Sequence, residues 1–206
     1  MIWSAVTGSD EKRVPTASLA ALPTGEPECV RPAQAGDSDN LRECYGRVAP
    51  TINGALDRSD ARWHAMELTL DHPHRYRYVY DDDGQIDGYV VYDQRSTGRQ
   101  WGFGITVHEL VAADARAAVT LWRHLASHVA QVDTVTVLAV PLDILTLLLP
   151  EQVVEFVAAN HWMTRMVDAA GAIAARGYRA GVRAEVHLKV ADRVAPERAE
   201  ASEVLI

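Results

Sequence analysis

Two histidines stand four residues apart, at a spacing that could hold a metal ion. His124 and His128 would lie on one face of a helix, because residues four apart are neighbours there. A zinc-protease helix carries a glutamate directly after its first histidine, and Leu125 occupies that position here. The sequence offers no evident third ligand. We therefore expect two solvated or partly packed histidines and assign no metal-binding residue.

A second chemical pattern lies at residues 99–104, which read RQWGFG. This segment fits the pattern (Gln or Arg)-x-x-Gly-x-(Gly or Ala), which binds the pyrophosphate of an acyl-CoA. Such glycines act after a strand, where backbone N–H groups and a helix N-terminus meet the phosphates. Here they precede the expected strand, which favours a hairpin connection, with CoA binding as the weaker alternative.

The turn that does precede the expected helix lacks the features of a phosphate site. Residues 112–116 read AADAR and contain no glycine. Asp114 would repel a pyrophosphate, although a carboxylate is favourable at the start of a helix. We assign no cofactor-binding residue to this chain.

Structural roles account for the other reactive side chains. Residues 83–88 approach a calcium-loop pattern, but Gln94 stands at the position of the bidentate glutamate, so a hairpin turn is expected. Residues 72–74 read HPH and are expected to end a helix, and neither Cys29 nor Cys44 has an activating neighbour. Five tyrosines are expected to pair across strands, with a catalytic tyrosine among them as the weaker alternative: Tyr76, Tyr78, Tyr80, Tyr89 and Tyr92. No catalytic residue is assigned.

A strand, a helix and a second strand must position these side chains. Residues 101–111 are rich in β-branched and aliphatic side chains, and residues 135–140 form another apolar run. The helix between them has one apolar face, made by Ala118, Leu121, Trp122, Leu125 and Val129. Because parallel strands need such a crossover, we predict an α+β fold, with a central parallel pair in a mixed sheet and flanking helices.

Further elements are expected on both sides of this unit. Before it, we expect a strand at 2–6, a polar turn at 7–12, a proline-rich linker, a short strand at 29–31, helices at 41–48 and 59–70, and a hairpin at 75–92. After it, we expect a helix at 142–149, strands at 153–157 and 162–167 with a turn at 160–161, a short helix at 173–176, and a strand at 182–190 that finds no partner before a charged tail.

Composition restricts the partners and the compartment. The 206 residues carry a formal charge of −8, and 48% of them are hydrophobic. An acidic chain without a basic face argues against nucleic acid and anionic membrane as partners, while a cationic small molecule fits its charge. Two cysteines build no disulfide framework and no signal peptide is recognisable, so a cytoplasmic location is expected.

Five short blocks resemble the central region of the Eis-like (enhanced intracellular survival) GNAT N-acetyltransferases. They are GALDRSDARW at 54–63, DGYVVY at 87–92, VHEL at 107–110 with LWRHL at 121–125, WMTRMVD at 162–168, and AARGY at 174–178. The resemblance implies acetylation of amines, including those of aminoglycosides, by acetyl-CoA. It also implies hexamers built from a catalytic GNAT domain, a degenerate GNAT-like domain and a sterol-carrier-like domain.

The resemblance suggests three segments in this chain. Residues 1–28 would be a remnant strand and a proline-rich linker, residues 29–168 a degenerate GNAT-like domain, and residues 169–206 a linker helix with an incomplete sterol-carrier-like strand and a charged tail. The family's catalytic acid and base have no counterparts here. Two hypotheses stay open: the chain is part of an Eis-like enzyme and lacks the catalytic half, so that self-association or a separate catalytic domain supplies its partner, or it is a non-catalytic scaffolding or ligand-binding module.

Overall fold

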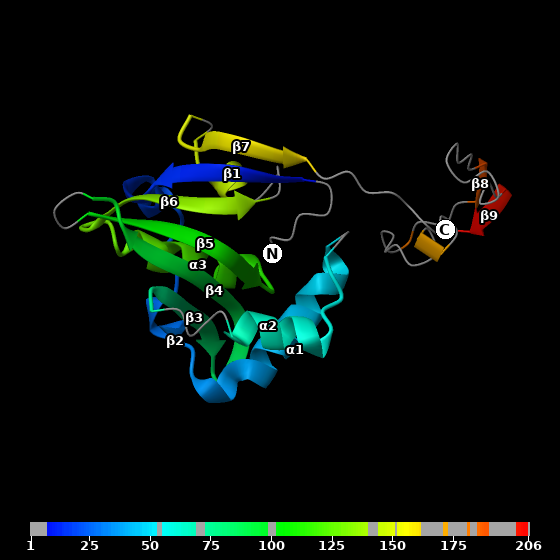
Figure 1. Cartoon of the computed structure of the whole chain (residues 1–206), viewed down its shortest axis with the longest axis horizontal. Coiled ribbons are helices and arrows are strands. Elements are labelled where there is room, and N and C mark those ends of the chain that lie inside the picture. The colour runs from blue at the N-terminus through cyan, green and yellow to red at the C-terminus, as the bar shows by residue number, and fades with distance from the viewer. Residues whose placement is uncertain are drawn as a thin grey trace. The chain divides into compact units, whose positions relative to one another are not determined.

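The computed structural model describes residues 8–52, 55–68, 73–98, 102–139, 144–150, 152–161, 171–172, 181, 185–189 and 201–205. The chain forms two compact units, Met1–Trp162 and Met163–Ile206. The first unit contains a seven-stranded sheet in the order β2-β3-β4-β5-β6-β1-β7 (Figure 1). Its strands are β1 (Gly8–Pro15), β2 (Val30–Pro32), β3 (Arg75–Asp82), β4 (Gln85–Ser96), β5 (Phe103–Ala112), β6 (Val132–Ala139) and β7 (Glu155–His161).

A parallel pair lies at the centre of this sheet. β5 and β6 pair in parallel, whereas the other described neighbours in the sheet are antiparallel. The helix α3 (Ala115–Ala126) connects the two parallel strands. The predicted α+β fold, a mixed sheet with a central parallel pair and flanking helices, is confirmed.

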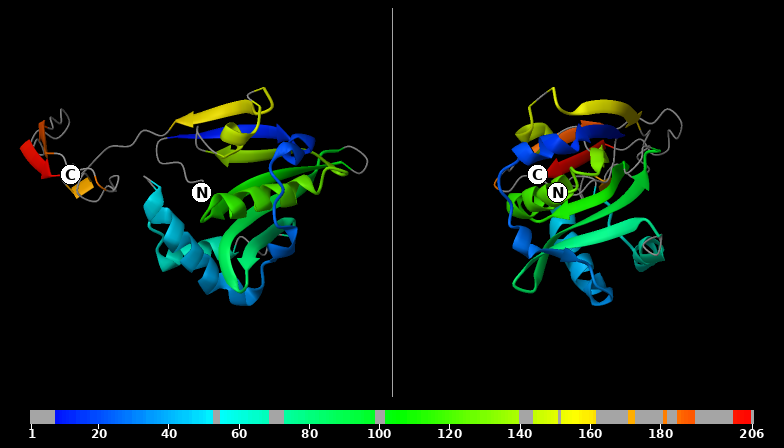
Figure 2. Two further views of the ribbon diagram at one scale, coloured as in Figure 1. Left: turned by 180° about the vertical axis from the view of Figure 1, so that it is seen from behind. Right: turned by 90° about the vertical axis from the view of Figure 1, so that its left-hand side faces the viewer.

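The sheet separates two hydrophobic clusters because side chains alternate along each strand. On β4, Val90 and Tyr92 pack in the cluster that contains α3, whereas Tyr89 and Val91 pack in the cluster of α1 (Ser38–Val48). The helix α2 (Asp60–Leu68) contributes Trp63 to the second cluster. Seen from behind in Figure 2, α3 lies in front of the central strands.

The hairpin of β3 and β4 turns at two residues with left-handed backbone. Asp83 has φ of 51° and Gly84 has φ of 92°, as a tight turn between twisted antiparallel strands requires. The Gly84 N–H donates to the Asp81 carboxylate at 2.7 Å. The segment with a calcium-loop pattern is therefore a hairpin turn, as expected.

The N-terminal segment differs from the prediction. Gly8–Pro15 is β1, which lies between β6 and β7 and pairs with both, so the polar turn expected at 7–12 is wrong. A 3₁₀-helix, Thr16–Ala21, follows in place of part of the expected linker. The sequence GSDEKRVP has no apolar alternation that would predict a strand. Its backbone groups pair with a strand on each side, and this pairing holds it in place. The strand expected at 2–6 lies outside the described residues.

The C-terminal elements also require corrections. β7 continues through Asn160 and His161, where a turn was expected. In the second unit, β8 (Glu185–Lys189) pairs antiparallel with β9 (Ala201–Leu205), so the strand expected to lack a partner has one within the supposed charged tail. The elements expected at 162–167 and 173–176 lie outside the described residues.

The other predicted helices are present with small shifts. α4 (Ile144–Leu148) lies within the helix expected at 142–149. The helix α3 ends at Ala126, so Val129 lies beyond it and is 51% exposed rather than part of the buried face. None of the described helices is long and apolar enough to cross a membrane.

We predict that Trp122→Ala destabilises the first unit by roughly 3–5 kcal/mol. Trp122 is fully buried on α3, so its removal leaves a large cavity under the helix. Chemical denaturation followed by circular dichroism measures the loss. Val129→Ala is the control and should change stability by less than about 0.5 kcal/mol; equal losses in both variants would contradict the assigned helix face.

Candidate functional site

The two parallel strands part at the carboxyl end of their ladder. The last described pair joins Val107 to Val137, after which β6 continues beside β1 and β5 continues to Ala112. A register shift between β4 and β5 at Val91 leaves His108 between two successive pairs. Ligands of open α/β sheets bind beyond the carboxyl ends of such strands. This opening, together with the N-terminus of α3, is therefore the candidate site.

The N-terminus of α3 is capped by its own chain. Asp114 is the N-cap, and its carboxylate accepts a hydrogen bond from the Ala117 N–H at 2.8 Å. The Ala113 N–H donates to the Asp87 carbonyl at 2.8 Å. Two of the N–H groups nearest the turn thus already have acceptors, and a negative charge stands where a phosphate would have to lie.

The cation at this end of the helix is also paired. The Arg116 guanidinium lies 2.8 Å from the Glu26 carboxylate and 3.6 Å from that of Asp82, and it donates to the Tyr80 hydroxyl at 3.0 Å. Tyr80 in turn donates to Glu26. Arg116 is therefore bound to carboxylates of its own chain at the helix end where an anionic ligand would need it.

The glycine pattern lies at the opposite end of β5. Ser96 pairs with Phe103, and the Thr97 N–H donates to the Gly102 carbonyl at 3.1 Å, so Gly102 ends the connection of β4 with β5. Gly104 lies at the start of β5, where it pairs with Arg95. The expected hairpin is confirmed. The other residues of the pattern, 99–101, lie outside the described residues.

A buried glutamate follows directly after the strands part. The Glu109 side chain is 7% exposed and forms an ion pair with Arg58, which is equally buried. The Tyr89 hydroxyl donates to Glu109 at 3.2 Å, and Arg58 lies 3.7 Å from the centre of the Tyr45 ring. Both oxygens of this carboxylate therefore already have cationic or hydroxyl partners inside the chain.

The second acid near the opening is equally constrained. Asp93 is 1% exposed and contacts three side chains, with Arg75 at 2.7 Å, Arg95 at 3.0 Å and His108 Nε2 at 3.0 Å. The Arg75 guanidinium, which bonds to it directly, holds the pKa of the Asp93 carboxyl far below its usual value. Asp93 therefore remains ionised and does not serve as an acid.

His124 of α3 and His128, which lies just beyond the end of the helix, pack against aromatic rings. The centres of the His124 and Tyr78 rings lie 4.1 Å apart. The His128 ring lies edge-on to the His124 ring, with 5.4 Å between their centres. Burial, assisted by the neighbouring His128, lowers the pKa of His124 to about 4. These are the partly packed side chains that the sequence suggested, and His124 is uncharged at neutral pH.

The tyrosines and cysteines have structural surroundings. Tyr76 pairs with Tyr92 across β3 and β4, with ring centres 5.5 Å apart, as predicted for cross-strand partners. Burial raises the pKa of the Cys44 thiol to about 11, and it also raises the pKa of Cys29. Both thiols are therefore protonated and weakly nucleophilic. Pro73 and His74 form a turn before β3, while His72 lies outside the described residues.

The two buried carboxylates of the sheet, Glu109 and Asp93, are not among the residues predicted from the sequence. Glu109 and Asp93 each interrupt an apolar strand, which is the signal that a buried acid with a partner was required. Their partners could not be read from the sequence, because Arg58 lies on the segment before α2 and Arg75 lies on β3.

We predict that Glu109→Gln costs about 3–5 kcal/mol of stability, because it leaves the Arg58 charge buried and unpaired. The double variant Arg58→Met with Glu109→Gln should be more stable than Glu109→Gln alone, since it removes the second charge as well. Urea denaturation compares the three proteins. If the single variant is as stable as the unmodified chain, Arg58 is less buried than described.

A pH dependence follows from His124. Its pKa is about 4 in the folded chain and 6.5 ordinarily, so the unfolded chain binds the proton first as the pH falls. The contribution of neutral His124 to the free energy of unfolding is complete above pH 6.5 and is lost progressively as the pH falls toward 4. Thermal unfolding across this range should show a smaller loss for His124→Gln than for the unmodified chain, and parallel curves would contradict the assignment.

Comparisons with known proteins agree with this fold. A family profile described as acetyltransferase (GNAT) domain matches residues 54–167. A GCN5-related N-acetyltransferase from Anabaena variabilis is 31% identical over 100% of this chain, with a TM-score of 0.79, and Eis1 from Mycobacterium abscessus is 24% identical over 98%, with a TM-score of 0.75. A GCN5-related N-acetyltransferase from Kribbella flavida is 25% identical over 98%, with a TM-score of 0.70.

The chain spans about half the length of these solved relatives, since it covers 52%, 53% and 48% of theirs. No curated protein matches it. The profile covers more than half of the sequence, and the relative from Anabaena variabilis is 31% identical over the whole chain. The chain belongs to the acetyltransferase (GNAT) domain family.

Proposed function

We propose that this chain is a non-catalytic GNAT unit of an Eis-like N-acetyltransferase. The whole enzyme would transfer the acetyl group of acetyl-CoA to amines, with aminoglycosides among its substrates, and a different GNAT domain would carry the reaction. The likeness to Eis1 and to GCN5-related N-acetyltransferases about twice as long supports this proposal.

One observation carries the non-catalytic role: the N-terminus of α3 is closed. Asp114 caps it, and Glu26 and Asp82 hold Arg116 beside it. Acetyl-CoA carries several phosphate charges, so this end of the helix would have to bring carboxylates and phosphates together. That repulsion opposes the binding that a helix N-terminus otherwise provides.

The acid–base groups support the same role. Transfer of an acetyl group to an ammonium requires a base to take its proton and an acid to protonate the leaving thiolate. Glu109 is ion-paired with Arg58, and Asp93 is paired with Arg75 and His108. Burial raises the pKa of the Tyr89 hydroxyl well above its usual value. Each of these groups therefore contributes to the internal packing of the unit and not to proton transfer.

We expect calorimetry of the 206-residue chain with acetyl-CoA to detect no micromolar binding. We also expect mixtures of the chain with acetyl-CoA and kanamycin to release no free coenzyme A thiol. An active GNAT enzyme in the same buffer is the positive control. Asp114→Asn keeps the helix cap and removes one charge; it should not restore binding, because Glu26 and Asp82 remain.

Micromolar binding by the unmodified chain would overturn the closed-site proposal. Addition of a catalytic GNAT domain from an Eis-like relative tests whether this chain is a unit of such an enzyme. Thiol release that rises when both chains are mixed, beyond the sum of the separate rates, supports a divided arrangement. Identical rates with and without this chain would contradict its membership in such an enzyme.

A further inference from the structure

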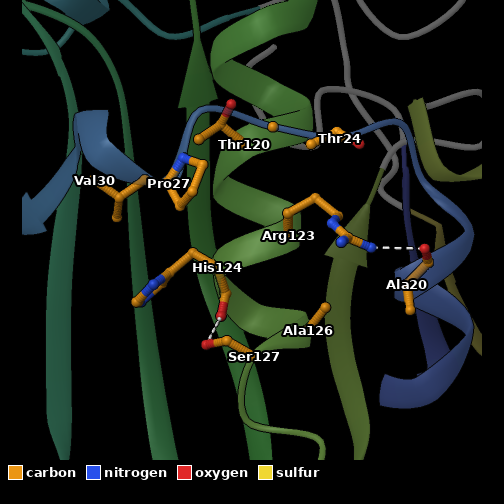
Figure 3. Close-up of a pocket in the computed structure, with 10 residues that line it drawn as sticks. Ala20, Thr24, Pro27, Val30, Thr120, Arg123, His124, Ala126 and Ser127 are labelled. Carbon is orange, nitrogen blue, oxygen red and sulfur yellow. Dashed lines mark hydrogen bonds between the residues drawn. The ribbon is translucent and has the colours of Figure 1, made fainter.

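A pocket of about 380 Å³ lies between the 20–30 segment and the outer face of α3 (Figure 3). It is separate from the opening between β5 and β6 and from the capped N-terminus of α3. Its volume lies within the range of small-molecule sites, about 300–1,000 Å³. The lining residues are Ala20, Thr24, Gly25, Pro27, Val30, Thr120, Arg123, His124, Ala126 and Ser127.

The segment that covers the pocket is fixed to the helix. The Glu26 N–H donates to Thr120 Oγ1 at 3.1 Å. A Cβ atom on Gly25 would stand 2.8 Å from the Thr120 Cα, so only glycine permits this approach. The Cys29 N–H donates to the Glu26 carbonyl at 3.0 Å and closes the next turn. A wall held in this way exists before a ligand arrives, which lowers the cost of binding.

The charge of the pocket is opposite to that of the chain. None of its ten lining residues is acidic, although the chain as a whole carries −8. Arg123 supplies one positive charge, and His124 is neutral, as shown above. Figure 3 shows Arg123 extended toward Ala20, whose carbonyl accepts a hydrogen bond from Nη1 at 2.6 Å.

Most of the Arg123 guanidinium remains available for a ligand. A guanidinium has five N–H donors, and the bond to Ala20 uses one of them. Within the described ranges, no carboxylate lies at ion-pair distance from Arg123, in contrast to Arg116, which lies seven residues earlier on the same face of α3. A planar group with unused donors suits the two oxygens of a carboxylate.

The remaining wall is mainly apolar. Pro27 and Val30 contribute from the covering segment, and Ala126 contributes from the helix. A single cation beside such walls fits a ligand with one negative group and a hydrophobic body, whereas a polyphosphate would require more donors. We propose that this pocket binds a small apolar carboxylic acid, with its carboxylate on Arg123 and its hydrophobic body against Pro27 and Val30. This proposal is independent of the proposed enzyme.

Benzoate and benzamide are matched probes, because they share a ring and differ in charge. Titration of the ¹⁵N-labelled chain should give saturable shifts of the Thr24, Gly25 and Ser127 amides with benzoate and at least about tenfold weaker binding of benzamide. Arg123→Gln should weaken benzoate binding by at least about tenfold. Arg62→Gln on the exposed side of α2 removes the same charge and should leave the affinity unchanged.

Several results would overturn the proposal: no saturable shift with benzoate, equal binding of benzamide, or unchanged affinity in Arg123→Gln. Competition by inorganic phosphate at the affinity of benzoate would indicate a simple anion patch and would also overturn it. If Arg123→Gln unfolds, Arg123→Lys takes its place, with reduced but saturable binding expected, and the comparison of the two probes on the unmodified chain still decides.

Discussion

The parallel pairing of β5 with β6 is the constraint on which the rest of this unit depends. Parallel neighbours cannot be joined by a tight turn, so α3 must cross one face of the sheet between them. That crossing buries Trp122 and assigns the odd and even side chains of β4 to two different clusters. It also places the start of α3, which Asp114 caps, beside the point where the strands part.

Charges inside the sheet show how buried carboxylates are stabilised near this point. Burial of a carboxylate is unfavourable unless cations and hydrogen-bond donors surround it. Glu109 receives Arg58 and Tyr89, and Asp93 receives Arg75, Arg95 and His108. Each carboxylate thereby becomes part of the packing between strands and the segments beside them. The surface of α3 farther along the helix is arranged differently, since Arg123 keeps unused donors in a pocket without acids.

The sequence predicted those elements that have a local pattern. The apolar face of α3 and the Asp83–Gly84 turn follow from side-chain spacing and turn chemistry, and both are present. β1 could not be predicted in this way, because its polar sequence has no period and its position depends on two distant strands. The segment expected to be a charged tail forms β9, which pairs with β8. At the site, the place of Asp114 at the start of a helix was predicted, whereas Arg58 and the 20–30 segment reach their partners only through tertiary structure.

The position of β1 also has a consequence for the order in which the sheet can assemble. Arg13 of β1 meets Glu155 of β7 across 142 residues of chain. During synthesis, β1 leaves the ribosome long before either of its neighbours, so its backbone groups must stay hydrated until β6 and β7 follow. The hairpin of β3 and β4 has no such delay. A polar sequence suits a strand that is made before its neighbours, because an alternating apolar strand in that place would favour premature pairing.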